Sequence, residues 1–256
     1  MKTEIKLNCG SGARMLELAD ASAQLVVTGP PYFPEEIEPL LRAGLDASAD
    51  LGALEIKIVT YGLTLRPVFQ ECYRVLAPGG RLIVQTRDVR LRHILVPVEA
   101  LHRQMIEAIG MKLYTRHLWR PIHTTLSRRQ NGAALAAIMG PAPFDPEVFL
   151  VFWKPGGLRQ GTPTPDDLKL LGQDMISTAP GQLPAQHRFQ SPLPLLTALI
   201  RTHTQPGDLV VDPFAGGGSV LHVASKLGRL AWGCEIDAKS LALAQINLGL
   251  NPKPGK

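Results

Sequence analysis

Short apolar runs rich in β-branched residues alternate along this chain with segments whose apolar residues recur at helical spacing. This alternation is the pattern of a mostly parallel sheet with helices on both faces. The predicted strands are Glu4–Leu7, Gln24–Val27, Arg81–Gln85, Lys112–Trp119, Val148–Trp153, Leu209–Asp212 and Leu230–Cys234. The predicted helices are Thr64–Leu76, Val98–Ile109, Pro192–His203 and Ser219–Leu227. An α/β, Rossmann-like fold is therefore expected.

The length of 256 residues, with 45% hydrophobic and 19% charged, suits one large domain or one domain with an inserted lobe. Prolines and glycines crowd the segment between Trp153 and Gln190, which predicts a loop-rich excursion or a linker; an ordered lobe is the less favoured interpretation. No leader pattern is seen and no apolar run approaches ~20 residues, so a cytoplasmic protein with no membrane span is expected.

Cysteines and histidines show no metal-binding spacing. The cysteines Cys9, Cys72 and Cys234 are widely separated, so free thiols that are buried or half-buried are expected. The lone histidines His93, His102 and His222 are interpreted as surface or core residues rather than ligands.

A ligand pocket is indicated near the carboxyl end of the chain. A buried strand ends at Asp212, a turn with three adjacent glycines follows, and a helix begins at Ser219. Glycines let the backbone approach a ligand where any Cβ would intrude. The next strand ends at Glu235, where an acid can accept hydrogen bonds from both hydroxyls of a ribose. The spacing is not G-x-G-x-x-G, so a nucleoside site is favoured over a dinucleotide site, and a purely structural glycine turn stays open.

An early strand ends in an unusual way, because Val26 to Phe33 reads Val-Val-Thr-Gly-Pro-Pro-Tyr-Phe. Two prolines fix the backbone directly after the apolar run and remove its N–H donors. In isolation the unit fits a strand terminator with a packed tyrosine as well as it fits a catalytic loop.

Together, these motifs resemble the S-adenosylmethionine-dependent DNA amino-methyltransferases that modify N4 of cytosine or N6 of adenine. Asp212–Gly218 matches the cofactor motif of that family, and Thr28–Tyr32 matches its D/N/S-P-P-Y catalytic motif. Further matches are Arg74–Ile83, Gly233–Asp237, and the run from His187 through Phe189, Pro192, Leu195 and Ile200. The resemblance implies a class I methyltransferase fold with the circularly permuted motif order of the beta group. It is weakest between Arg120 and Ala185.

The resemblance also implies roles for individual residues. The residues implied to hold S-adenosylmethionine are Asp212, Phe214, Ala215, Gly216, Gly218, Ser219, Glu235, Phe189 and Ser11, the last at a place where the family often has an acid. The implied catalytic residues are Gly29, Pro30, Pro31 and Tyr32. Pro30 would offer its carbonyl to the amino group, and Tyr32 would stack on the extruded base.

Gly29 departs from the family pattern. The family has Asp, Asn or Ser there, so one of the two acceptors for the amino protons is missing. Losing such an acceptor costs ~2–4 kcal/mol of transition-state stabilisation unless another group replaces it. A catalytically weak or silent protein that binds DNA and the cofactor is therefore the alternative to an active enzyme.

Basic residues concentrate in the middle of the chain. From Arg87 to Arg129 there are nine Lys and Arg against three acids, a local balance of +6 within a net charge of +5. Such a segment suits a phosphate-tracking surface, although a solvated helix face would look similar. The resemblance places target recognition beyond Trp119, which makes Arg116, Arg120, His123, Arg128 and Arg129 the candidate DNA contacts.

We therefore predict a catalytic-motif half in residues 1–119, a variable target-recognition or loop region in 120–186, and a cofactor-binding half in 187–256. The predicted activity is site-specific methylation of double-stranded DNA. Thr28 and Phe33 resemble the T-S-P-P-Y-F form of the family motif, which favours cytosine as the methylated base. By analogy with the family, a homodimer, a cognate restriction endonuclease and a place at the nucleoid are expected. Methylation of RNA or protein is the third reading.

Overall fold

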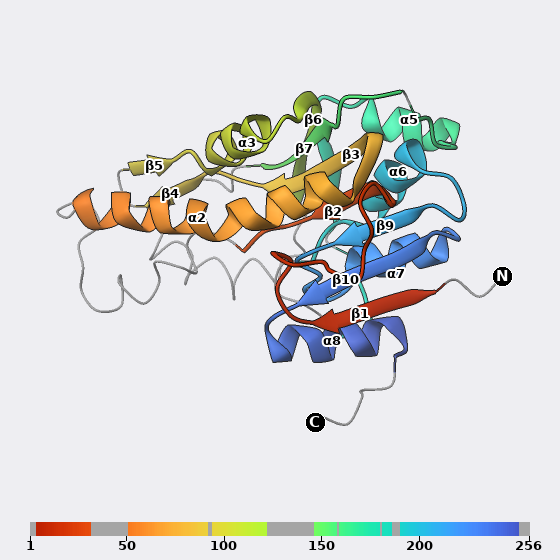
Figure 1. The fold of residues 1–256 in the computed structure, drawn as a ribbon. Coiled ribbons are helices and arrows are strands. Elements are labelled where there is room, and N and C mark those ends of the chain that lie inside the picture. Colours follow the sequence, from red (N-terminus) through yellow and green to blue (C-terminus); the bar gives the residue numbers. More distant parts are fainter. Residues whose placement is uncertain are drawn as a thin grey trace.

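A computed structural model describes residues 4–31, 51–91, 94–121, 146–157, 159–179, 181–185 and 190–250. Its main feature is an eight-stranded sheet with helices on both faces (Figure 1). The sheet strands are β1 (Ile5–Cys9), β2 (Ala23–Thr28), β3 (Leu76–Thr86), β6 (Lys112–Pro121), β7 (Glu147–Trp153), β8 (Ile176–Thr178), β9 (Leu209–Asp212) and β10 (Leu230–Glu235). A separate hairpin joins β4 (Val89–Leu91) and β5 (Ile94–Val96). The helices are α2 (Leu51–Val75), α3 (Val98–Ala108), α5 (Pro165–Leu171), α6 (Leu193–His203), α7 (Ser219–Lys226) and α8 (Ala238–Leu248).

The sheet is mostly parallel, as predicted. Its strand order is β1-β10-β9-β2-β3-β7-β6-β8. The first five of these strands run parallel, β7 is antiparallel to both β3 and β6, and β8 is parallel to β6. All seven predicted strands and all four predicted helices are present within a few residues of their expected bounds, except that α2 starts well before Thr64.

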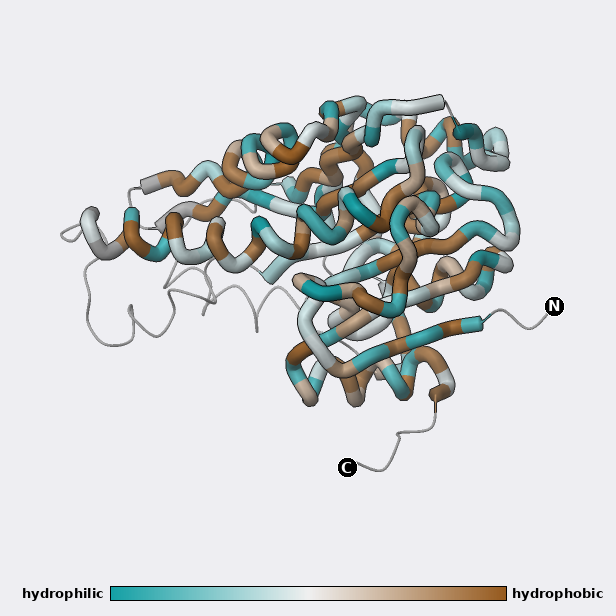
Figure 2. Tube along the Cα trace, viewed as in Figure 1, coloured by the Kyte–Doolittle hydropathy of each residue, from teal (hydrophilic) through white to brown (hydrophobic). Residues whose placement is uncertain are grey.

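Alternate residues of the central strands feed two apolar cores, one on each face of the sheet. Val26 packs into the core under α2 and α3, while its neighbours Leu25 and Val27 pack into the core under α6 and α7. This split follows from the two-residue period of a strand. Along α2, hydrophobic and hydrophilic residues alternate from turn to turn (Figure 2), as expected for a helix with one face on the sheet.

The Ala-Pro-Gly-Gly segment from Ala77 to Gly80 does not form a separate turn between α2 and β3. It lies within β3 as an irregularity, because the pairing of β2 with β3 jumps from Ala23–Leu76 to Leu25–Arg81. Gly79 takes a φ of 83°, and a Cβ there would lie 1.8 Å from the carbonyl oxygen of Gly157. Glycine is required at this position by both conformation and space.

The proline-rich segment after Trp153 is more ordered than predicted. Thr164 and Asp167 form a capping box that starts α5. Strand β8 then pairs with β6, and the Trp119 indole N–H donates to the Thr178 hydroxyl at 3.0 Å. The expectation of a loop or linker is therefore wrong for this part of the chain.

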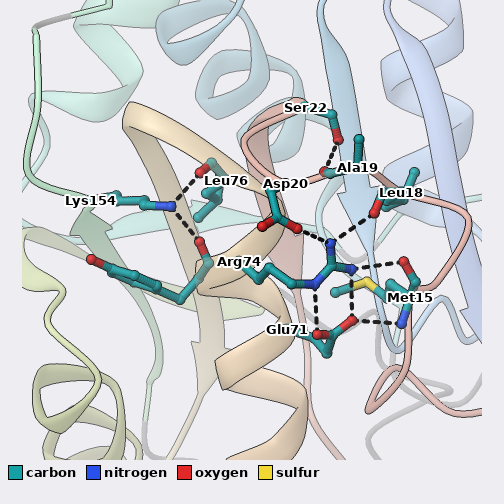
Figure 3. A network of polar contacts seen from close by, with 10 residues as sticks. Met15, Leu18, Ala19, Asp20, Ser22, Glu71, Arg74, Leu76 and Lys154 are labelled. Atoms are coloured by element: carbon teal, nitrogen blue, oxygen red, sulfur yellow. Dashed lines mark hydrogen bonds and ion pairs between the residues drawn. The ribbon is translucent and has the colours of Figure 1, made fainter.

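The end of α2 is fixed to the β1–β2 connection by Arg74 (Figure 3). Its guanidinium donates to both carboxylate oxygens of Glu71, to Asp20 and to the carbonyl oxygens of Met15 and Leu18. The hydrogen bonds to Glu71 raise the pKa of Arg74, and those from Arg74 lower the pKa of Glu71. This network holds the chain segment that leads into β2.

Lys154 secures the same helix end from the other side. Its ammonium group donates to the carbonyl oxygens of Tyr73 and Leu76, both at 2.7 Å (Figure 3). Tyr73 lies in the last turn of α2, whose final carbonyls lack helical partners, so a cation near it also complements the helix dipole. The entry into β3 is thereby fixed relative to β7.

Candidate active site

A cavity of about 900 Å³ opens at the carboxyl ends of β2, β9 and β10. Strand β9 connects onward to β10 on one side, while β2 and β3 lie on its other side. Ligands of open α/β sheets bind at this kind of switch point. The cavity is lined by Val27, Thr28, Gly29, Pro30, Pro31, Gln85, Ser191, Leu196, Asp212, Phe214, Ala215, Gly216, Gly217, Ser219, Val220, Glu235, Ile236, Asp237, Lys239 and Ser240.

The glycine-rich turn between β9 and α7 forms one wall of the cavity. Gly216 and Gly218 have φ values of 50° and 82°, in the left-handed region that favours glycine. The N–H of Ala215 donates to the carbonyl of Cys234, which ties the turn to β10. The turn therefore presents backbone rather than side chains to the cavity at Gly216 and Gly217.

Glu235 closes the second wall at the tip of β10. One carboxylate oxygen accepts from the N–H of Gly216 and the other from the N–H of Asp237, both at 2.8 Å. Each carboxylate oxygen keeps a further lone pair. The carboxylate is thus fixed in place with acceptor capacity left for the hydroxyls of a ligand.

Asp212 at the end of β9 contacts the end of β2. Its Oδ1 accepts from the Thr28 hydroxyl at 2.8 Å and from the N–H of Phe214 at 3.1 Å. Burial raises the pKa of Asp212 to about 7, against the opposing effect of these two hydrogen bonds. Strands β2 and β9 pair directly through Leu25–Val210 and Val26–Val211, so the two motifs end side by side.

A buried tyrosine holds the proline step after β2. The Tyr61 hydroxyl of α2 donates to the carbonyl of Pro31 at 3.0 Å and lies 2.9 Å from Nε2 of His102 on α3. Burial lowers the pKa of His102 to about 3, so its imidazole is neutral. Because the single hydroxyl proton goes to Pro31, Nε2 is the His102 nitrogen that carries the proton. His102 is a core residue, as predicted, with a specific partner.

The surrounding residues leave room for a side chain at position 29, so packing does not require glycine there. A Cβ built on Gly29 would meet only the Cβ of Gln85, at 3.9 Å, which is an ordinary contact. Its φ lies outside the left-handed region. A serine, asparagine or aspartate would therefore fit, and the missing side chain leaves open room in the cavity wall.

Three polar residues that the sequence did not single out meet beside Gly29. Gln85 at the end of β3 donates through Nε2 to the Glu147 carboxylate at the start of β7. Ser191 donates its hydroxyl proton to Oε1 of Gln85 at 2.6 Å. Gln85 and Glu147 are buried, although both are polar. The pairing of β3 with β7 brings Gln85 and Glu147 together, and Ser191 reaches them from the start of α6.

Nine of the predicted site residues line the cavity, and others do not. Those lining it are Gly29, Pro30, Pro31, Asp212, Phe214, Ala215, Gly216, Ser219 and Glu235. Gly218 lies against α8, where its Cβ would meet that of Ala244 at 3.3 Å, and the exposed Ser11 accepts from the N–H of Ala13 after β1. The residues that fall outside the described ranges are Tyr32, His123, Arg128, Arg129 and Phe189.

The two described candidates for DNA contact lie on one face of β6. Arg116 and Arg120 are both exposed, and Arg116 lies 3.5 Å from the Glu99 carboxylate. Trp119, near the end of β6, pairs with Glu147 at the start of β7. The neighbouring Arg120 therefore lies on the side of the sheet formed by the carboxyl ends of the parallel strands, where the cavity also opens.

The described residues hold no group of three His, Cys, Asp or Glu side chains that could bind a metal ion. Among the described helices, none has the length and apolar character needed to cross a membrane. The predicted free thiols fit Cys72 and Cys234, which are buried, but Cys9 is exposed.

The cavity fits S-adenosylmethionine better than a dinucleotide. Its lining carries Glu235 and Asp237, together with Asp212, whose pKa burial raises to about 7, against the single cation Lys239. This excess of acids would repel a pyrophosphate and attract a ligand that carries a sulfonium and an ammonium group. The left-handed glycine backbone at the wall leaves room for a closely packed nucleoside. Fold and site together define a Rossmann-like protein whose cavity fits S-adenosylmethionine.

Comparison with known proteins narrows this class. A family model described as DNA methylase, of the N6/N4 methyltransferase type, matches residues 167–245. The type II methyltransferase M.MjaI of Methanocaldococcus jannaschii is 27% identical over 98% of this chain and 93% of its own length. The type II methyltransferase M.MthZI of Methanothermobacter thermautotrophicus is 27% identical over 96% of this chain and 78% of its own. The family model and these relatives support an N4-cytosine/N6-adenine DNA methyltransferase, as the motifs of this chain predicted.

Two solved structures have folds similar to that of this chain. A protein of Thermus thermophilus, provisionally described as a DNA modification methylase and complexed with S-adenosyl-L-methionine, is 25% identical with a TM-score of 0.71, over 98% of this chain and 100% of that chain. The cytosine-N4-specific PvuII DNA methyltransferase shares the fold, with 17% identity and a TM-score of 0.69 over 100% of this chain and 89% of that chain. The permuted beta-group assignment stays a prediction.

Proposed function

We propose that this chain transfers a methyl group from S-adenosylmethionine to the exocyclic amino nitrogen of cytosine (N4) or adenine (N6) in DNA. The supporting observation is the direct pairing of β2 with β9, which places Gly29, Pro30 and Pro31 on the same cavity as the glycine-rich turn. The relatives named type II methyltransferases favour an active modification enzyme over a silent binding protein.

Each part of the site has a role in this reaction. The amino lone pair forms the new N–C bond while the C–S bond of the donor breaks, its electron pair stays on sulfur, and one amino proton passes to water. The turn at Gly216 and the Glu235 carboxylate hold the nucleoside of the donor. The Pro30 carbonyl accepts one amino proton as a hydrogen bond, and Tyr61 keeps the following Pro31 in position. Fixed alignment of nitrogen and methyl supplies much of the acceleration.

We extend the proposal to finer features. Thr28 and Phe33 favour cytosine as the base, and Tyr32 stacks on it outside the duplex. Residues 1–119 and 187–256 form the two halves of the catalytic domain, and 120–186 contribute target recognition. Double-stranded DNA is the substrate, and we propose that the chain acts as a homodimer at the nucleoid alongside a cognate restriction endonuclease.

The activity test uses labelled S-adenosylmethionine with the full chain and unmethylated DNA of mixed sequence. We expect label in DNA, and digestion followed by mass analysis should yield N4-methylcytosine. Recovery of N6-methyladenine would support the proposed methyltransferase activity but show that the methylated base is adenine. Label only in RNA or protein controls would refute the proposal. Cofactor binding without transfer, with transfer restored by Gly29→Ser, would favour the silent alternative.

DNA contact by β6 can be tested with a matched pair of variants. Arg120→Ala should weaken DNA binding and lower the slope of log affinity against log salt by about 1, because one phosphate contact is lost. Lys112→Ala changes the same charge at the opposite end of β6 and should leave the slope unchanged. Equal effects of the two variants would contradict this placement of the DNA.

A further inference from the structure

The missing side chain at Gly29 leaves the reacting amino group one acceptor short, and this inference rests on the proposed methyl transfer to that group. Any replacement must reach the space beside Gly29 from another element. The Thr28 hydroxyl does not serve, because it donates to Asp212 at 2.8 Å and points to the opposite side of β2 from Gly29. The candidates are therefore the polar groups of β3 and β7.

Gln85 is the residue of β3 that lies next to Gly29. Strands β2 and β3 are parallel and Thr28 pairs with Val84. The next residues along the chain from these two, Gly29 and Gln85, therefore lie side by side. A Cβ on Gly29 would contact the Gln85 Cβ at 3.9 Å, and both residues line the cavity together with Pro30. Gln85 is 7% exposed, which is unusual for a glutamine and fits a role within the cavity.

The orientation of the Gln85 amide is fixed by its two partners. The amide nitrogen Nε2 donates to the Glu147 carboxylate and therefore faces Glu147. The amide oxygen then faces Ser191, whose hydroxyl donates to it at 2.6 Å. A carbonyl oxygen has two lone pairs, and Ser191 uses one of them. The second lone pair is available to a donor in the cavity.

We propose that Oε1 of Gln85 accepts the hydrogen bond from the amino group that an Asp, Asn or Ser side chain at position 29 would otherwise accept. Gln85 is then a catalytic residue, while Glu147 and Ser191 are positioning residues that fix its amide. The neutral amide takes no proton; it holds the amino group so that the nitrogen lone pair points at the methyl carbon. Pro30 and Gln85 together supply the two acceptors.

The test compares single-turnover methylation of mixed-sequence DNA by the full chain and its variants. Gln85→Met keeps the volume but removes the acceptor, and its rate constant should fall on the order of 10²-fold. Gly29→Ser fits the open space, so the double variant Gly29→Ser/Gln85→Met should recover most of that loss. Gln24→Met, at the other end of β2 and outside the cavity, is the matched control and should keep the wild-type rate.

Two further measurements separate catalysis from folding. The dissociation constant for S-adenosylmethionine, measured by calorimetry, should be the same in Gln85→Met and in the Gln24→Met control. The melting temperature measures how much stability Gln85→Met loses with its hydrogen bonds to Glu147 and Ser191. Glu147→Gln should lower kcat by less than Gln85→Met does, with KM for DNA unchanged, because the amide loses its fixed orientation but not its oxygen.

Each outcome decides the matter. Rescue by Gly29→Ser supports the assignment even if Gln85→Met lowers stability, since a purely structural role would not be restored by a hydroxyl at position 29. A Gln85→Met variant with the wild-type rate, or one that Gly29→Ser does not rescue, overturns the assignment alone. A wild-type chain that binds the cofactor but labels no DNA overturns the proposed function, and the assignment with it.

Discussion

The titration of Asp212 should make the stability of the protein depend on pH in a way that one substitution removes. Burial raises the pKa of this carboxyl from an ordinary 3.8 to about 7 in the folded chain. Between these values the folded protein binds a proton that the unfolded chain has released. The free energy of unfolding therefore falls as pH rises through this window, and the contribution of Asp212 is complete below pH 3.8 and lost above pH 7.

The size of this effect follows from the shift. About three pKa units correspond to ~4 kcal/mol, of which ~3 kcal/mol falls between pH 5 and pH 8. Asp212→Asn removes the titration but keeps an oxygen that can accept from Thr28 and Phe214. Relative to wild type, the variant should gain ~3 kcal/mol of unfolding free energy when the pH is raised from 5 to 8.

Urea unfolding at intervals from pH 5 to 8.5 measures the difference. Asp237→Asn is the control, because that carboxyl is fully exposed and the hydrogen bonds from Ser240 lower its pKa, so it stays ionised throughout the range. His102 and His203, whose pKa values burial lowers, are present in both proteins and cancel. If the wild-type and Asp212→Asn curves run parallel across the range, Asp212 does not titrate as a buried acid and the reasoning fails.

Three other substitutions test the site by calorimetry, thermal melting and methyl transfer. Tyr61→Phe should cost ~1–2 kcal/mol of stability and slow methyl transfer at unchanged cofactor affinity, because Pro31 loses its donor; an unaltered rate would count against this positioning role. Gly12→Ala places a Cβ 2.5 Å from that of Pro213, so stability should fall by ~1–3 kcal/mol, and an unshifted melting temperature would contradict the packing. Glu235→Gln should weaken S-adenosylmethionine binding about tenfold, since an amide nitrogen would face one of two backbone donors; equal affinity would argue against its role.

The parts of the fold that could be predicted are those with local chemical causes. The glycine turn after Asp212 and the Pro-Pro step after Thr28 both end apolar strands, and both are found at the carboxyl edge of the sheet. Parallel strands bring such ends to one edge, so a shared cavity follows from the fold class alone. The pairing of β2 with β9 then places the two motifs next to each other.

The sequence pattern does not predict helix α5, although the start of this helix carries a local signal. Thr164 is followed by Pro165 at the first helical position and by Asp167 three residues later, which together are a helix-start pattern. The surrounding prolines and glycines outweighed it. Strand β8 had no such local signal, because three residues form a strand only where an exposed edge, here that of β6, is available to pair with them.

The environment of Gly29 shows the limit of the sequence in physical terms. The motif identifies the missing acceptor, because the family pattern specifies which side chain is expected at that position. It cannot identify the replacement, because Gln85 is separated from Glu147 by 62 residues and from Ser191 by 106. No local period relates these positions; they meet only after β3 pairs with β7 and α6 packs below β2. A substitution that removes a catalytic group thus cannot be interpreted as loss of function until the neighbouring strands are known.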